Sequence, residues 1–117
     1  MSMYQFKRLN IVGDFIGKVE RAVLDESYGD TVYATRHECA KVVVPDVVLN
    51  DREIKHIIET FRARKSYKCA FFTVQEALNG KSIYDFGPYK DALKKLVTGS
   101  TLTPETKLFI VSFYRWH

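Results

Sequence analysis

Two carboxylates and a lysine in this chain have the order found in metal-dependent nucleases. Asp46 follows Pro45, and Glu53 and Lys55 complete the pattern. Such enzymes hold a divalent cation between two carboxylates and place a lysine near the attacking water. Here Glu53 and Lys55 fall in the first turn of an expected helix and point to different faces. A small metal-dependent nuclease is therefore the third and least favoured of the functions we consider.

Histidine and cysteine supply a second, weaker pattern. His37 and Cys39 resemble part of a zinc-deaminase signature, but the sequence lacks the Pro-Cys-x-x-Cys segment that completes it. Cys69 would bring the ligands only to three, one short of a closed zinc site. Both cysteines are expected as buried free thiols. With no nucleophile elbow and no phosphate-binding glycine loop, the sequence predicts a non-enzymatic protein without metal or cofactor.

Basic residues interleaved with aromatic ones form the most frequent pattern, densest in residues 61–68 and 113–117. Single-stranded nucleic acid is bound by cations on its phosphates and by aromatic rings under its bases. We therefore expect a nucleic-acid-binding face. Its candidate phosphate contacts are Arg62, Arg64, Lys65, Lys68 and Arg115, and its candidate stacking rings are Tyr67, Tyr114 and Trp116.

The distribution of charge supports this interpretation. The first 58 residues carry eight basic and nine acidic side chains, whereas the rest of the chain carries ten and five. A basic face built by the second half suits an anionic partner, although the same charge would also serve solubility. No segment has the roughly 20 apolar residues that a membrane helix needs, so we expect a cytoplasmic protein without a membrane partner.

Three segments are similar to the RegA translational repressors of tailed phages: residues 14–24, 31–37, and 109–113 followed by Trp116. The resemblance implies an RNA-binding protein that blocks initiation on particular messages. It would place Lys18 on an RNA-contacting helix and Phe113 as an aromatic ring near RNA. Gly17 interrupts that helix, and residues 65–105 do not resemble the family.

Hydrophobic periodicity predicts the order β-α-β-β-α-β-α-β within a single domain, residues 1–117. Strands are expected at residues 3–9, 31–37, 41–49, 67–74 and 107–114, with the fourth in the centre. Helices are expected at residues 14–25, 50–65 and 88–97, with a helical turn at 75–80 and a loop at 82–88. Asp14 and Asn50 are the expected N-caps, and Glu53 completes a capping box with Asn50. This order predicts an α+β fold, a mostly antiparallel sheet of about five strands with two to three helices on one face.

The favoured function is a nucleic-acid-binding regulator of single-stranded RNA or DNA, which the RegA resemblance narrows to a phage-type translational repressor. The alternative is a small protein–protein interaction module, such as a phage-encoded inhibitor or adaptor of a host protein. Tyrosine, tryptophan and arginine are also the residues that dominate protein interfaces. The same side chains therefore serve both hypotheses.

Overall fold

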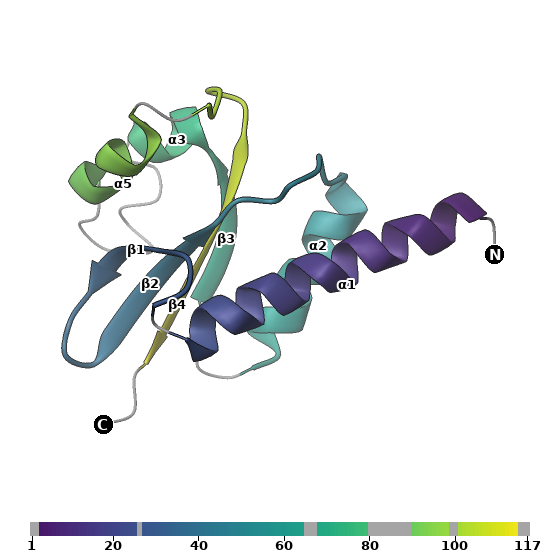
Figure 1. The fold of residues 1–117 in the computed structure, drawn as a ribbon, viewed down its shortest axis with the longest axis horizontal. Coiled ribbons are helices and arrows are strands. Elements are labelled where there is room, and N and C mark those ends of the chain that lie inside the picture. The colour runs from purple at the N-terminus through teal and green to yellow at the C-terminus, as the bar shows by residue number, and fades with distance from the viewer. Residues whose placement is uncertain (1–2, 26, 65–67, 80–89, 99–100, 115–117) are drawn as a thin grey trace.

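The computed structural model describes residues 3–25, 27–64, 68–79, 90–98 and 101–114, which form an α+β fold. The expected loop at 82–88 and the expected helix start at Pro88 lie outside these residues. The elements run in the order α1 (Met3–Leu24), β1 (Asp30–Ala34), β2 (Glu38–Val43), α2 (Asp51–Arg62), β3 (Lys68–Thr73), α3 (Val74–Leu78), α5 (Lys90–Val97) and β4 (Lys107–Tyr114) (Figure 1).

The described strands form one four-stranded sheet in the order β1-β2-β4-β3, with every neighbouring pair antiparallel. The last strand in the chain, β4, therefore lies between β2 and β3. Val111 of β4 is opposite Lys41 on one side and Cys69 on the other. The expectation that the fourth predicted strand is central was wrong, because β3 borders the sheet and pairs with β4 alone among the described strands.

The largest difference between the predicted and the observed secondary structure lies in the first 24 residues. Residues 3–9, expected as a strand, are the beginning of the 22-residue helix α1. Asp14 is therefore not an N-cap but lies in the middle of this helix. The buried residues of α1 recur at helical spacing along one stripe: Val12, Phe15, Val19 and Ala22.

Gly13 and Gly17, which argued against a continuous helix, lie on the exposed side of α1. A Cβ atom at either position would meet no atom within 4 Å, so neither glycine is required by a close contact. Each costs about 1 kcal/mol of helix propensity relative to alanine. Burial of the opposite stripe outweighs that cost, and the helix continues.

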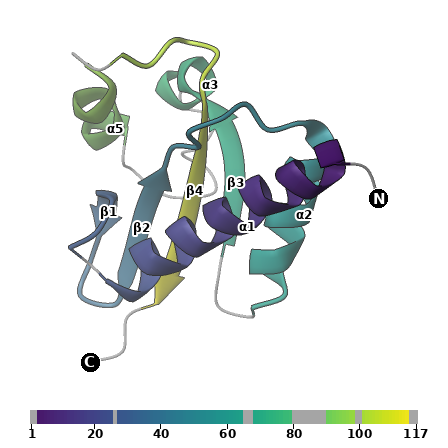
Figure 2. The same ribbon diagram turned by 45° about the vertical axis from the view of Figure 1, so that its right-hand side comes forward.

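Helices cover both faces of the sheet rather than one (Figures 1 and 2). On one face, Phe109 and Val111 of β4 pack in a core cluster with residues of α1 and α2. On the other face, Leu108 and Ile110 pack with residues of α3 and α5. Successive side chains of a strand point to opposite faces, so an apolar strand such as β4 needs a cover on both. That requirement explains why the prediction of helices on one face was wrong.

Phe109 is the centre of an aromatic cluster that joins three other elements. Its ring centroid lies 4.7 Å from that of Phe71, 5.6 Å from that of Phe61 and 5.8 Å from that of Phe15. These rings come from β3, α2 and α1, and Phe109 itself is fully buried. One side chain of the central strand thus contacts both helices of its face and the neighbouring strand.

We expect Phe109→Ala to lower the free energy of unfolding by about 3–5 kcal/mol, because it removes buried apolar area and leaves a cavity among three rings. Urea unfolding followed by circular dichroism measures the loss. Leu24→Ala is the control, since Leu24 is exposed and should change stability by less than about 0.5 kcal/mol. Equal effects of the two substitutions would contradict this account of the core.

Candidate nucleic-acid interface

The candidate binding residues gather where three elements meet at one end of the sheet. Helix α2 ends at Arg62, β3 starts at Lys68, and β4 ends at Tyr114. In Figure 1 the end of α2, the start of β3 and the end of β4 all lie toward the labelled C-terminus. We call Arg62, Arg64, Lys68 and Tyr114 the basic end. The other candidates, Lys65, Tyr67, Arg115 and Trp116, lie outside the described residues.

Lys68 and Tyr114 share one face of the sheet. Lys68 is opposite Ser112, and Tyr114 is two residues further along β4, which makes it a diagonal neighbour of Lys68. Because Cys69 and Val111 belong to the core under α1 and α2, alternation turns Lys68 and Tyr114 to the other face. Both side chains are exposed, Tyr114 by 60%. A ring and an ammonium group in this arrangement can contact a base and its phosphate.

Arg62 and Arg64 lie on the α2 side of the same end, and both are exposed. The Arg64 guanidinium donates a hydrogen bond to Glu20 Oε1 of α1 at 3.0 Å and stands 5.1 Å from the centroid of the Phe61 ring. An exposed ion pair of this kind contributes at most about 1 kcal/mol. Arg64 therefore joins α1 to α2 and can exchange its carboxylate partner for a phosphate at little cost.

Arg62 stands beside the thiol of Cys69. Burial raises the pKa of Cys69, and the positive charge of Arg62 and its hydrogen bond to the thiol lower it by less. The Cys69 thiol also donates a weak hydrogen bond to Ile58 O at 3.7 Å. The thiol is thus held protonated beneath α2, and it is a packing group rather than a nucleophile.

The two residues suggested by the RegA resemblance lie in different places. Lys18 Nζ donates hydrogen bonds to Val44 O at 3.1 Å and Asp46 Oδ1 at 3.4 Å, which ties α1 to the loop after β2. Phe113, only 5% exposed, points to the sheet face that α1 and α2 cover. Its ring is enclosed because it alternates with Tyr114, so it offers no stacking surface in this structure.

Glu53, which belongs to the nuclease-like pattern, uses its carboxylate for hydrogen bonds within the protein. Its carboxylate accepts hydrogen bonds from Arg8 Nε at 2.7 Å, from a second Arg8 nitrogen, and from the backbone N–H of Asn50 at 2.9 Å. The Asn50 side chain in turn accepts from Glu53 N at 2.9 Å. The predicted capping box is therefore confirmed, and the start of α2 is fixed to α1 through Arg8.

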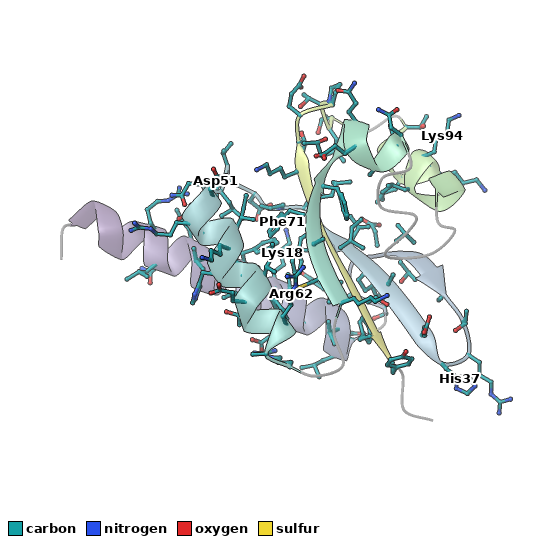
Figure 3. The ribbon with its side chains drawn as sticks, turned by 180° about the vertical axis from the view of Figure 1, so that it is seen from behind. Lys18, His37, Asp51, Arg62, Phe71 and Lys94 are labelled. Atoms are coloured by element: carbon teal, nitrogen blue, oxygen red, sulfur yellow. The ribbon has the colours of Figure 1, made fainter. Side chains whose placement is uncertain are left out.

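The remaining metal-binding candidates are also dispersed. Lys55 is exposed and lies 4.0 Å from Glu59 on the same helix. Cys39 and Cys69 are buried free thiols, as predicted, and β4 separates their strands. His37 projects from the tip of the β1–β2 hairpin (Figure 3). Within the described ranges, no three His, Cys, Asp or Glu side chains gather to hold a metal ion.

Sequence reasoning missed two basic residues that organise the fold. Arg8 was placed on a strand, so its pairing with Glu53 could not be foreseen. Lys41 is fully buried in β2, and its Nζ donates to Tyr28 O at 3.1 Å. The signal for Lys41 was its position inside the apolar run of residues 39–44. Its ammonium group holds the turn between α1 and β1.

No family model, curated protein or solved structure matches this chain. The resemblance to the RegA repressors therefore stays a prediction. In the part of the chain that the structure describes, no helix has both the length and the apolar character to cross a membrane. The geometry of the basic end is thus the main basis for a functional proposal.

We expect Glu53→Gln to lower the free energy of unfolding by about 1–3 kcal/mol at neutral pH, since it removes the charge from the hydrogen bonds to Arg8. Those bonds hold the pKa of Glu53 below its ordinary value of 4.5. A depressed pKa stabilises the fold above the unfolded value, and this stability is lost as pH falls through the folded pKa. The difference between variant and parent should therefore shrink in acid.

Urea unfolding at neutral pH and at a series of acidic pH values measures this difference. Glu59→Gln is the matched control, because Glu59 lies on the same helix with an exposed carboxylate. If Glu53→Gln lowered the free energy of unfolding by the same amount down to the most acidic pH, the ionised Arg8–Glu53 pair would not be the cause of the loss.

Proposed function

We propose that this protein is a regulator that binds single-stranded RNA or DNA through its basic end. The observation that carries the proposal is the shared sheet face of Lys68 and Tyr114, at the end where α2 brings Arg62 and Arg64. Five large hydrophobic side chains are exposed in the described residues, and of these only Tyr114 is aromatic. The Tyr114 ring and the ammonium group of Lys68 supply the two chemical features that a single strand requires, and Arg62 and Arg64 add positive charge on the α2 side of the same end.

In this proposal a base stacks on the Tyr114 ring while Lys68 contacts the phosphate of that nucleotide or of the next. Ser112 and Glu38 lie beside them, since Ser112 is opposite Lys68 and Glu38 is opposite Tyr114. Both are partly exposed and can hydrogen-bond to the edge of a splayed base. A duplex keeps its bases stacked inside, so the arrangement favours a single strand.

Arg62 and Arg64 extend the cationic surface around the edge of the sheet to α2. Lys65 and Tyr67 lie between Arg64 and Lys68 in the sequence, and Arg115 and Trp116 directly follow Tyr114. Chain connectivity therefore keeps these further cations and rings within a few residues of the basic end. A surface that binds a strand without altering it suits a regulator that occludes its target. The RegA resemblance favours messenger RNA as that target.

We expect Tyr114→Ala to weaken binding of single-stranded RNA or DNA by about 5- to 150-fold, because one base stacked on an aromatic ring contributes about 1–3 kcal/mol. Tyr114→Phe, which keeps the ring, should bind as the parent does. Fluorescence anisotropy with labelled random-sequence strands at low salt measures both affinities. Equal binding by the alanine variant would remove Tyr114 from the interface.

Lys68→Gln should reduce the slope of log affinity against log salt by about one, because one phosphate contact and its released counterion are lost. Lys94→Gln is the matched control. Lys94 is exposed on α5, away from the basic end in Figure 3, and its loss should leave the slope unchanged. A parent protein that binds no strand even at about 50 mM salt would refute the proposed function.

A further inference from the structure

The loop between β2 and α2 exposes two apolar side chains at the end of the sheet opposite the basic end. Val47 is 42% exposed and Val48 is 90% exposed. The loop leads into Asp51, which Figure 3 shows at the far end of α2 from Arg62. Exposed apolar side chains that lie together beside a cavity are typical of binding surfaces.

The loop is held in place by two basic residues of α1. Arg8 Nη2 donates to Val48 O at 3.1 Å, and Lys18 Nζ donates to Val44 O at the same distance. Leu49, directly after Val48, is buried in the core under α1 and α2. Because both sides of Val48 are anchored, its side chain is presented to solvent by a fixed backbone.

A cavity of about 360 Å³ opens beside the valines. Val47 and Val48 contribute to its lining, so the exposed side chains and the cavity belong to one continuous surface. Apolar and charged residues line the cavity: Pro45, Leu49 and Phe71, with Asp46, Glu105 and Lys107. The three charged side chains are exposed, and they carry both signs.

We propose that this surface is the interface between two copies of the chain, in which Val48 of each copy enters the cavity of the other. In a two-fold dimer the same patch occurs on both sides, so a surface must be complementary to itself. This surface has an apolar projection beside a cavity whose walls include Pro45, Leu49 and Phe71. It also has Lys107 beside Glu105, so a two-fold partner can place Lys107 of each copy against Glu105 of the other, while Asp46 is paired with Lys18 of its own chain.

A second copy fits this surface better than a charged peptide does. A peptide rich in one sign of charge would select a rim of the opposite sign, whereas this rim carries both signs, with Lys107 beside Glu105 and Asp46 paired with Lys18. Dimerisation through the loop would also leave the basic end uncovered, since the two lie at opposite ends of the sheet. The inference does not depend on the proposed function, because it concerns different residues.

Sedimentation equilibrium of the full chain from about 1 μM to about 1 mM tests the proposal, since this range covers the affinities of small dimer interfaces. We expect the mass to rise from 13.6 kDa toward twice that value. Val48→Asp should keep the mass at that of one chain, because it would place a negative charge against the apolar walls and the two carboxylates of the cavity. Thermal unfolding monitored in parallel should show that this variant is folded, since Val48 makes little contact within its own chain.

Leu24→Asp is the matched control. Leu24 is 83% exposed at the other end of α1, so the same change of side chain there should leave dimerisation intact. A parent that stays monomeric over the whole range overturns the proposal, as does a dimer that persists in Val48→Asp.

A cross-linking experiment tests the arrangement of the two copies. Thr106 lines the cavity, so mixing Val48→Cys protein with Thr106→Cys protein should give a disulfide between the two variants under mild oxidation. The natural cysteines are buried, and Leu24→Cys mixed with Thr106→Cys is the control that should give none. A dimer that forms equal amounts of both cross-links contradicts the assignment of Val48 to the cavity of the second copy.

Discussion

The apolar side chains of β4 point alternately to the two faces of the sheet, and both sets must be kept from water. Phe109 and Val111 require the layer formed by α1 and α2, whereas Leu108 and Ile110 require the layer formed by α3 and α5. The position of β4 between β2 and β3 makes this requirement central to the whole fold. The two end residues of β4, Lys107 and Tyr114, are exposed, whereas the residues between them are buried or partly buried.

Many of the basic residues of this protein hold the fold together rather than contribute a free positive surface. Arg8 pairs with the capping residue of α2, Lys18 holds the loop after β2, and Lys41 is buried against the turn after α1. The net charge of +4 therefore overstates the charge available to a partner. Among the described candidate phosphate contacts, Lys68 lies on the same sheet face as the exposed ring of Tyr114. The positions of the basic side chains therefore identify the candidate site more closely than the net charge of the chain does.

The sequence allowed accurate prediction where local chemistry decides the structure. The Asn50–Glu53 capping box and the bounds of β4 follow from capping and periodicity, and both are confirmed. The helical turn expected at 75–80 overlaps α3, Val74–Leu78, whose first residue was expected in a strand. The strand predicted at residues 3–9 was wrong, because a short alternation such as that of Tyr4 and Phe6 cannot distinguish a strand from the start of a helix. The RegA resemblance implies that Phe113 lies near RNA, whereas the structure buries this ring. Which face of β4 each helix covers depends on long-range packing, which the alternation within one strand does not specify.

The two ends of the sheet therefore have different chemistry for a structural reason. At one end α2 and β4 finish and β3 begins, with cationic and aromatic residues. At the other end Arg8 and Lys18 fix a loop that exposes Val47 and Val48. Binding of a strand at one end and of a second copy at the other would not compete for the same surface. A dimer would then carry two strand-binding ends directed apart. Such a dimer gains avidity only on a nucleic acid long enough to reach both, because effective concentration vanishes when the linker cannot span the sites.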